Sequence, residues 1–376
     1  MRNDPALWPS PSWHLTKFSP DAPVLYFAPE VLQATARRFI DGFAGLVTYA
    51  VKANDHEAVL TNLVNAGLTA FDVASPLEMA RVRRVAPDAV LHYHNPVRSV
   101  AEITEAVGHG IASWSVDCPR ELQKLADVPR VGTEIAVRLR LPVAGAAYDF
   151  GEKFGADPDQ AVALLQQARD MGFETSLTFH PGTQCADPQA WAVYIVEAAD
   201  VARRAGVTLK RLNVGGGFAA HRSGPAPDLE AIFNRIAAET RRAFGADAPA
   251  LVCEPGRAMV AEAFTLAVRV KTVRDTAVFL NDGIYGALTE LRDIGVPDRI
   301  SVLRPDGVVV EGEMAPKVVY GPTCDSLDRL PDPVALPAQI GEGDFVMIKA
   351  MGAYSSSLST GFNGYGLQEM VTVATL

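Results

Sequence analysis

The sequence predicts an α/β protein in which a closed (β/α)8 barrel, similar to a TIM barrel, is followed by a smaller, mostly-β domain. Strand-like and helix-like segments alternate from residue 24 to residue 262, and short apolar runs recur along that stretch. After residue 262 the helical pattern fades. We therefore expect a barrel domain over residues 24–262 and a β domain over residues 263–376, which an N-terminal strand at about residues 10–20 would join.

Eight short apolar runs are the candidate strands of the barrel. They begin near Leu46, Ala70, Val90, Ile111, Ile135, Ser176, Arg211 and Ala250. Between them lie segments with apolar residues at helical spacing, such as residues 158–171, 191–205 and 228–244, the last of which starts at a possible N-cap, Asp228. An open doubly wound sheet is the alternative, but it should carry a Gly-x-Gly-x-x-Gly turn after its first strand, which this chain lacks.

The region after residue 262 contains apolar runs that are separated by turns rich in Gly, Pro and Asp. The expected strands cover residues 264–273, 277–280, 299–303, 317–320, 344–350 and 370–376. Because helical periodicity is largely missing, we expect a β domain here.

The composition excludes several classes of protein. A chain of 376 residues with 48% hydrophobic residues can bury a large core, and a net charge of −10 argues against nucleic acid and anionic membranes as main partners. No apolar run reaches the roughly 18 residues of a membrane-spanning helix, and the N-terminus lacks the apolar core of a signal peptide. The four cysteines show neither metal spacing nor a disulfide framework, so we expect a cytoplasmic protein.

Lys52 ends an apolar strand, residues 46–52, and polar residues follow shortly after it. A lysine at the end of a buried run should lose part of its hydration. That loss favours the neutral amine and makes it a usable nucleophile, as Schiff-base chemistry requires. The alternative, for this residue taken alone, is a side chain that reaches out of the strand end into solvent.

Three further motifs also follow apolar strands. In Glu254-Pro-Gly-Arg257, a carboxylate and a guanidinium on one turn suit a cofactor that has a basic ring nitrogen and a phosphate. In Gly215-Gly-Gly217, the missing side chains let backbone N–H groups approach an anion. In His180-Pro-Gly-Thr183, an imidazole and a small hydroxyl share a tight turn.

The chemistry of a (β/α)8 barrel takes place at the carboxyl ends of its strands. The candidate functional residues fall at or near those ends, at Lys52, Asp72, Asn95, Arg138, His180, Gly215–Gly217 and Glu254. We therefore expect them to form one site. His92 and His94 share one strand face, which could suggest a metal, but no third ligand is visible and we expect no metal site.

Eight motifs, taken together and in this order, resemble the ornithine/lysine decarboxylase family. They are residues 49–54, 71–75, 179–183, 215–218, 254–257, 281–286, 321–325 and 352–354. That family consists of pyridoxal-phosphate-dependent enzymes with the alanine-racemase-like barrel, known as fold type III. The resemblance covers nearly the whole chain, and it implies the barrel fold predicted above.

The resemblance implies pyridoxal 5'-phosphate as cofactor. Lys52 would bind it covalently, Glu254 would keep its pyridine nitrogen protonated, and His180 would stack on its ring. Its phosphate would be held by Thr183, Gly216, Gly217, Arg257 and Tyr354. Asp72 and Arg138 are further candidate contacts, with a structural ion pair between them as the alternative, and Tyr354 could instead be a packing residue with a tethered hydroxyl.

The resemblance also implies a substrate site. Asp282 and Asp325 would bind the distal ammonium of a basic amino acid, Phe362 would line this end of the site, and Cys324 would return a proton to the α-carbon after carbon dioxide leaves. The alternatives are a turn aspartate for Asp282 and a small buried hydrophobe for Cys324. In the family, Cys324 and Asp325 reach the site of the neighbouring subunit, which implies a two-fold homodimer. Residues 355–361 depart from the family pattern, so the amino acid is less well defined than the cofactor.

The function that the resemblance favours is decarboxylation of L-ornithine to putrescine, a step of polyamine biosynthesis. L-lysine, or both amino acids, is the alternative, because one methylene changes binding by only about 1–3 kcal/mol. Meso-diaminopimelate fits less well, since its second carboxylate would face two aspartates. A racemase would need another acid/base pair. A non-catalytic regulator would be expected to lose Lys52, Glu254 or Cys324, and all three are present.

Overall fold

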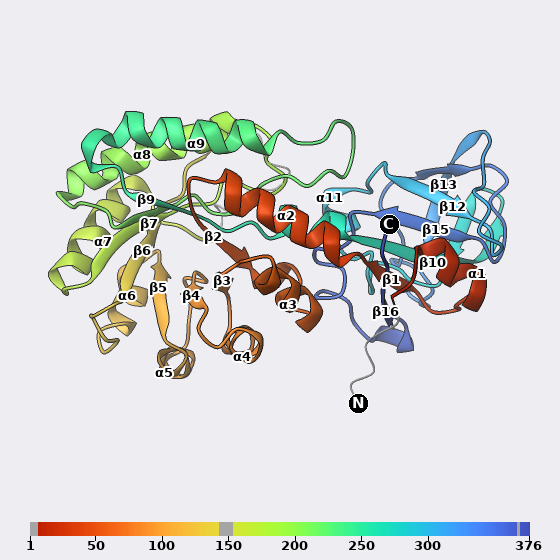
Figure 1. Ribbon diagram of the computed structural model, residues 1–376, viewed down its shortest axis with the longest axis horizontal. Helices are drawn as coiled ribbons and strands as arrows, with labels where there is room; N and C mark the ends of the chain where they lie inside the picture. The colour runs from red at the N-terminus through yellow and green to blue at the C-terminus, as the bar shows by residue number, and fades with distance from the viewer. Residues whose placement is uncertain (1–6, 143–152, 367–368) are drawn as a thin grey trace. The chain divides into compact units, whose positions relative to one another are not determined.

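The computed structural model describes residues 7–142, 153–366 and 369–376. The chain divides into two compact units (Figure 1). We call residues 35–219 and 227–259 the barrel unit, and the remainder the sheet unit. Within the described ranges, no helix combines the length and the apolar content needed to cross a bilayer.

Eight parallel strands close the barrel in sequence order, which confirms the predicted fold class. They are β2 (Gly45–Ala50), β3 (Ala70–Val73), β4 (Val90–Tyr93), β5 (Ile111–Val116), β6 (Glu134–Arg138), β7 (Glu174–Thr178), β8 (Arg211–Asn213) and β9 (Ala250–Cys253). The barrel closes where β2 pairs with β9. The two backbones approach so closely there that a Cβ atom at Gly45 would lie 2.3 Å from the carbonyl oxygen of Leu251.

Helices follow the barrel strands. They are α3 (Glu57–Asn65), α4 (Pro76–Val85), α5 (Val100–Gly108), α6 (Pro119–Lys124), α7 (Pro158–Asp170), α8 (Pro188–Ala205) and α9 (Leu229–Phe244). α2 (Pro29–Gly42) precedes β2, and the short helices η1 (Val51–Ala53), η2 (Gly245–Asp247) and α10 (Arg257–Val260) complete the set. Asp228 accepts a hydrogen bond from the backbone N–H of Ala231 at 2.9 Å, so it is the N-cap that the sequence predicted for α9.

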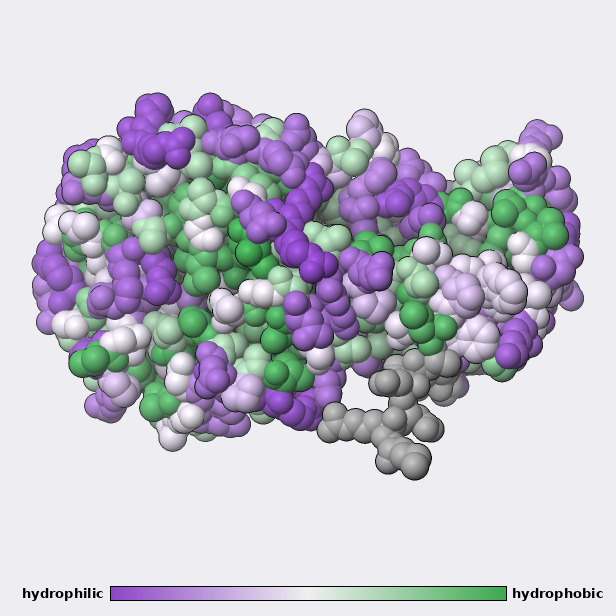
Figure 2. Space-filling model, viewed as in Figure 1, coloured by the Kyte–Doolittle hydropathy of each residue, from purple (hydrophilic) through white to green (hydrophobic). Residues whose placement is uncertain are grey.

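The barrel helices are amphipathic, which is why they cover the strands. α9 buries Ile232, Phe233 and Ile236, which lie at helical spacing, and it exposes Glu230 and Arg241. Figure 2 shows hydrophilic residues gathered along the upper edge of the view, over α8 and α9. The apolar stripe of α9 therefore faces the protein, and its polar side faces the solvent.

The sheet unit is built around one eight-stranded sheet. Its strands are β1 (Val24–Phe27), β10 (Phe264–Arg274), β11 (Ala277–Leu280), β12 (Ile300–Leu303), β13 (Met314–Tyr320), β14 (Val334–Pro337), β15 (Phe345–Lys349) and β16 (Glu369–Thr372). Six of them follow the order β12-β15-β10-β11-β13-β14, while β1 pairs with β10 and β16. The helical elements are α1 (Pro11–Phe18), η3 (Ala261–Ala263), α11 (Leu291–Ile294) and η4 (Phe362–Gly364).

The prediction of a strand at about residues 10–20 is wrong, because α1 occupies that segment. The buried residues Pro11, His14 and Leu15 have the i, i+3, i+4 spacing of a helix face, and Pro11 occupies the first helical turn, where proline is favoured. Aromatic contacts reinforce the helix, since the His14 ring lies 4.9 Å from Phe18 and 5.4 Å from Trp8.

The expected domain limits also need correction, since residues 24–34, 220–226 and 260–262 belong to the sheet unit. β1 pairs antiparallel with β10 and parallel with β16, and all four of its residues are buried. β14 was not predicted at all. It begins next to Pro333 and ends at Pro337, and these prolines weaken the strand pattern in the sequence. The strand can form because β14 lies at the end of the strand order, where proline is tolerated.

We expect Phe264→Ala to destabilise the sheet unit by about 3–5 kcal/mol, the usual range for emptying a buried phenylalanine site. Phe264 is fully buried, and its ring stacks on Phe27 with centroids 4.6 Å apart. The matched control, Val308→Ala, removes a side chain that is 59% exposed and should change stability by less than about 0.5 kcal/mol. Urea denaturation measures both, and equal midpoints for the two variants would contradict this core assignment.

Candidate active site

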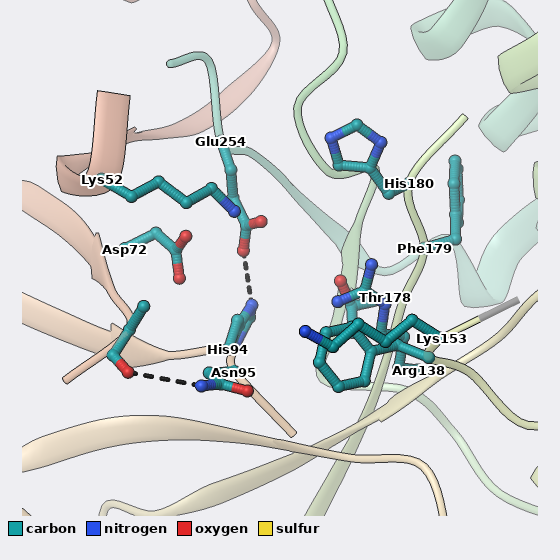
Figure 3. Close-up of a pocket in the computed structure, with 12 residues that line it drawn as sticks. Lys52, Asp72, His94, Asn95, Arg138, Lys153, Thr178, Phe179, His180 and Glu254 are labelled. Carbon is teal, nitrogen blue, oxygen red and sulfur yellow. Dashed lines mark hydrogen bonds and ion pairs between the residues drawn. The ribbon is translucent and has the colours of Figure 1, made fainter. Parts of the chain in front are cut away.

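The carboxyl ends of the barrel strands surround a cavity of about 220 Å³ (Figure 3). Residues predicted from the sequence line it from five different strands or the turns after them: Lys52, Asp72, Arg138, His180 and Glu254. Asn95 lines it as well. The structure thus brings together side chains that are far apart in the sequence, such as Lys52 and Glu254, as expected for the strand ends of a barrel.

Lys52 lies in η1, directly after β2, and its side chain extends toward Asp72 and Glu254 (Figure 3). The expectation that burial would desolvate this lysine is wrong, because Lys52 is exposed in the chain while its neighbours Val51 and Ala53 are buried. The 3-10 turn lifts the side chain out of the strand and into the cavity. Its chemistry therefore depends on the acidic groups that it faces.

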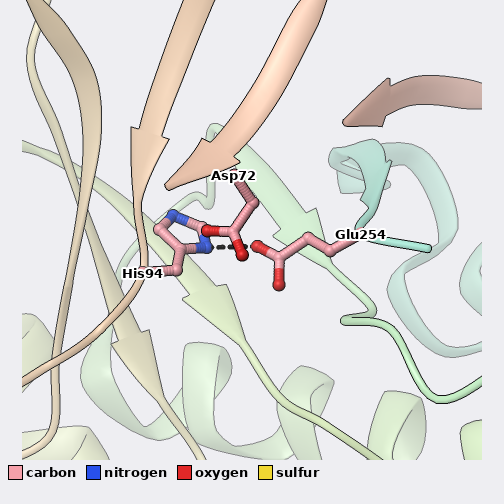
Figure 4. A group of neighbouring side chains, drawn as sticks. All are labelled: Asp72, His94 and Glu254. Atoms are coloured by element: carbon pink, nitrogen blue, oxygen red, sulfur yellow. Dashed lines mark hydrogen bonds and ion pairs between the residues drawn. The ribbon is translucent and has the colours of Figure 1, made fainter. Parts of the chain in front are cut away.

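The Glu254 carboxylate contacts side chains that come from two other strand ends, His94 and Asn213; Figure 4 shows the contact with His94. Its Oε1 atom contacts Nδ1 of His94 and accepts a hydrogen bond from Nδ2 of Asn213. Burial alone would raise the pKa of the Glu254 carboxyl, but His94, Lys52 and Asn213 lower it, and the net pKa lies well below the ordinary value. A buried negative charge therefore persists at the end of β9.

The pKa of Asp72 is shifted in the opposite direction to that of Glu254. Burial and the neighbouring Glu254 carboxylate raise the pKa of Asp72 well above its usual range, and Lys52 and His94 offset this only in part. Within the described part of the chain, its Oδ1 atom has no hydrogen-bond partner. Two acids with divergent pKa values lie side by side, which is characteristic of acid–base sites. No ion pair joins Asp72 to Arg138 among the described residues, so that alternative is not supported.

The glycine run after β8 has no room for side chains. A Cβ atom at Gly216 would lie 2.6 Å from the carbonyl oxygen of Glu254, and one at Gly217 would lie 2.1 Å from that of Gly182. Gly217 also has a positive φ of 83°, which favours glycine. The loop therefore packs directly between the Glu254 turn and the His180 turn, where an anion could be held by backbone groups.

His180 begins the turn that the glycine run contacts. Its Nδ1 atom accepts a hydrogen bond from the backbone N–H of Gly182 at 3.0 Å, which leaves Nε2 as the protonated nitrogen. Burial, Arg138 and Lys52 lower the pKa of His180 to about 3, so the ring is neutral. Thr183 lies in the same turn, and Arg257 is buried at the start of α10.

The sheet unit brings a second set of predicted residues together. The Tyr285 hydroxyl donates to Oδ2 of Asp325, while the Cys324 thiol lies 3.4 Å from Oδ1 of Asn363. The rings of Tyr285 and Phe362 are 4.8 Å apart. Three separate segments thus meet around an exposed thiol and a half-buried carboxylate. The hydrogen bond from Tyr285 lowers the pKa of Asp325, which is therefore anionic at neutral pH.

The structure assigns Asp282 to the alternative that we gave for it, a turn aspartate. Its carboxylate accepts hydrogen bonds from the backbone N–H groups of Gly283 and Ala287, both at 2.9 Å, and only 1% of the residue is exposed. Burial raises the pKa of Asp282 to about 6. Because the carboxylate is buried inside the turn, the expectation that Asp282 binds an ammonium group is not supported.

Tyr354 lies in the sheet unit in a strained conformation, with a φ of 58°. Left-handed backbone is unusual for an aromatic residue and often marks a functional position. The preceding Gly352 has no room for a side chain, since a Cβ atom there would lie 2.1 Å from the carbonyl oxygen of Val260. The backbone around Tyr354 is therefore tightly constrained.

Sequence reasoning missed several residues at these sites, namely Ser113, Lys153, Phe154, Thr178, Phe179, Asn213, Tyr285 and Asn363. Asn213 had a visible signal, because it precedes the glycine run at the end of a strand. Sequence reasoning also found no third metal ligand beside His92 and His94. The structure places Asp72 and Glu254 beside His94, with ligand atoms within 4.8 Å of one another, but a direct contact with Glu254 occupies the His94 ring (Figure 4).

Comparison with known proteins identifies the family. Residues 30–261 match the family model of the pyridoxal-dependent decarboxylase pyridoxal-binding domain. The chain is 33% identical to decarboxylase flvG of Aspergillus flavus (84% of this chain, 77% of that protein). It is 30% identical to ornithine decarboxylase of Rattus norvegicus and 28% identical to antizyme inhibitor 2 of Xenopus laevis (each 84% of this chain, 73% of that protein).

Solved structures agree with this result. The arginine decarboxylase of Paramecium bursaria Chlorella virus, bound to agmatine, matches with a TM-score of 0.83 and 26% identity, covering 93% of this chain and 97% of that one. The lysine/ornithine decarboxylase of Vibrio vulnificus, complexed with cadaverine, matches with a TM-score of 0.81 and 26% identity, covering 94% and 93%. These likenesses extend over both units of this chain.

The barrel cavity fits the pyridoxal cofactor that the family model names. The glycine run packs against the Glu254 and His180 turns with no room for side chains, and a loop that presents only backbone groups suits a phosphate. The ionised Glu254 suits a protonated ring nitrogen, the neutral His180 suits the face of a ring, and Lys52 supplies the amine. The chain belongs to the pyridoxal-dependent decarboxylase family and is a carboxy-lyase that uses pyridoxal phosphate.

Proposed function

We propose that this enzyme decarboxylates L-ornithine to putrescine, a step of polyamine biosynthesis. The observation that carries the proposal is the Asp325 carboxylate, which is anionic and stands next to the exposed Cys324 thiol. An anion beside the proton donor suits a substrate whose distal group is a cation. The identity to the rat ornithine decarboxylase supports the same amino acid.

L-lysine, or both amino acids, is the second candidate. The Vibrio vulnificus structure contains cadaverine, and its enzyme is named for both lysine and ornithine. One methylene discriminates weakly, so dual activity is compatible with the same carboxylate. The viral structure with agmatine extends the comparison to arginine, whose guanidinium favours paired contacts with a carboxylate. Here the two oxygens of Asp325 accept hydrogen bonds from Tyr285 and Leu327, and each oxygen keeps a further lone pair for the distal cation of a substrate.

The reaction breaks the bond between the α-carbon and the carboxylate, and bound pyridoxal phosphate would supply the electron sink for the pair left on the α-carbon. Lys52 would hold the cofactor covalently between turnovers, and Glu254 would keep the ring nitrogen protonated. The Cys324 thiol then gives its proton to the α-carbon. A proton from solvent would then restore the thiol, which balances the reaction.

Thr183, Gly216, Gly217 and Arg257 would hold the cofactor phosphate from the barrel unit. Tyr354 would complete this set, a role that its strained backbone supports. Asp72 and Arg138 line the cavity and would contact the rest of the cofactor. Phe362, next to Tyr285, would border the substrate.

We infer a two-fold homodimer in which Cys324 and Asp325 serve the neighbouring subunit's site, and a cytoplasmic location. The exposure of Cys324, together with that of Leu327 at 70%, supports a contact surface around this loop. The non-catalytic alternative remains relevant because antizyme inhibitor 2 is among the relatives. The presence of Lys52, Glu254 and Cys324 favours the enzyme.

We expect the cofactor to be attached at Lys52. The purified enzyme should absorb near the edge of the visible range, and borohydride should discharge that band and leave a reduced adduct on Lys52. Peptide mapping by mass spectrometry measures the position, and Lys52→Ala should abolish steady turnover, because the chain then lacks the amine. Lys153→Ala, which changes the other lysine of the cavity, is the matched control and should retain the adduct. An adduct on any other lysine would refute the assignment.

Cys324→Ala should slow the return of the proton to the α-carbon. Part of the substrate should then be protonated on the cofactor, which yields an aldehyde and an aminated cofactor instead of the diamine. Chromatography of the products measures the ratio of aldehyde to diamine. Cys118→Ala, in the barrel unit, is the control and should give the diamine alone. An unchanged rate with no aldehyde from Cys324→Ala would make Cys324 a packing residue.

Asp325→Ala should raise KM for ornithine and lysine by at least about tenfold, because a charge-assisted contact with the distal ammonium is lost. The cofactor absorbance should not change. Asp332→Ala, which removes an exposed carboxylate of the same unit, should leave KM near the wild-type value. Mixing inactive Lys52→Ala chains with Asp325→Ala chains tests the shared site. Random pairing makes half of the dimers mixed with one intact site each, so about a quarter of wild-type activity is expected. No recovery, with mixed dimers shown to form, would place both residues in one chain's site.

A further inference from the structure

His94 is a buried group of the barrel unit to which the proposed function assigns no role. It follows β4 directly, is 7% exposed, and points toward Glu254 (Figure 4). Its Nδ1 atom contacts Oε1 of Glu254, and its Nε2 atom lies 2.9 Å from the Ser113 hydroxyl. Both ring nitrogens are therefore engaged, which fixes the plane of the ring.

The proton on this contact can be assigned from the partners. An ionised carboxylate can only accept, so Nδ1 of His94 must carry a proton and donate it to Glu254. A hydroxyl can donate or accept, so Ser113 suits either form of the second nitrogen. Asn213 supplies the other donor to the same oxygen, and its orientation is set because its Oδ1 accepts the Gly215 N–H at 2.9 Å.

Two donors on Oε1 leave Oε2 as the oxygen that Glu254 can offer to the cavity. The interior of such barrels is dominated by branched apolar residues, so a histidine here has a cost that only a specific contact offsets. His92, two residues earlier, stacks on His94 with ring centroids 5.3 Å apart, but hydrogen-bonds to Arg211 instead of Glu254. The two histidines therefore lie close together on one strand face and have different partners.

We propose that His94 is a positioning residue for the cofactor: its Nδ1–H group holds Oε1 of Glu254, keeps this carboxylate ionised, and directs Oε2 toward the ring nitrogen of pyridoxal phosphate. The inference rests on the cofactor of the family and not on which amino acid is the substrate. His94 acts through Glu254 and does not touch the reacting atoms.

Electrostatics support this geometry. Burial alone would lower the pKa of His94, but the Glu254 and Asp72 carboxyl groups raise it, and the net direction is upward. Burial, His94 and Arg211 lower the pKa of His92 well below its ordinary value, so His92 is neutral. Among the described residues, the titratable groups around the pair of His94 and Glu254 are Lys52, Asp72, His92, Glu134, Arg138, His180 and Cys253.

The pH dependence of cofactor binding follows from this arrangement. In the wild-type chain the pKa of Glu254 is low, so its carboxylate stays ionised from about pH 5.5 to 8.5. Without His94, burial is less well offset and the pKa of Glu254 rises. Below that raised pKa the carboxyl is neutral, and the affinity for the protonated ring should fall by up to about tenfold for each pH unit.

The test is the dissociation constant of pyridoxal phosphate, measured by equilibrium dialysis of the holoenzyme over this pH range without any amino acid. Dividing each value by that of the wild type removes the titration of the cofactor itself. His94→Ala should bind more weakly as the pH falls. In His94→Asn the amide nitrogen can take the place of Nδ1, and it should restore a flat ratio. His92→Ala, the matched control, removes the same ring from the same strand face and should also give a flat ratio.

Three results would contradict the role proposed for His94. A flat ratio for His94→Ala, the same pH-dependent loss in His92→Ala, or no recovery in His94→Asn would each overturn the proposal. The absorbance of the bound cofactor, recorded on the same samples, should shift with pH only in His94→Ala. Because no substrate is used, the result stands whether or not the enzyme prefers ornithine.

Discussion

The buried negative charge of Glu254 is the constraint on which the rest of the site depends. Removing a carboxylate from water favours its neutral form, so the charge persists only because donors and a cation surround it. His94 comes after β4, Asn213 ends β8 and Lys52 follows β2, so each of these groups is delivered by a different strand. Closure of the barrel is therefore also the condition for the charge state of the site.

Much of this arrangement could be predicted from the sequence, because the signals are local. Short apolar runs that end in Lys52, Asp72, Arg138 or Glu254 are visible in the sequence, and parallel strands of a barrel must bring such ends together. Asn213 and His94 were harder to interpret. The roles of their side chains depend on contact with Glu254, which is far away in the sequence. In addition, a histidine on a buried strand face is compatible with several roles.

The errors have a common physical cause, since they concern features that tertiary contacts decide. The segment of α1 shows apolar residues that suit a strand or a helix, and packing with Trp8 selects the helix. The residues of β14 have a weak strand pattern, and the segment forms a strand because it pairs with β13. Asp282 precedes a glycine, and only the structure shows both of its oxygens turned inward to backbone N–H groups.

The pairing of β1 with β16 has a consequence for how the protein is made. β1 is translated among the first residues described here, and its parallel partner is translated among the last. The barrel strands all lie between them, so the barrel can close while the ribosome is still at work. β1, buried on every residue, meets its antiparallel partner β10 only after the barrel strands have been made, and its parallel partner β16 later still. Until those partners are made, the unpaired backbone edges of β1 are open to premature association.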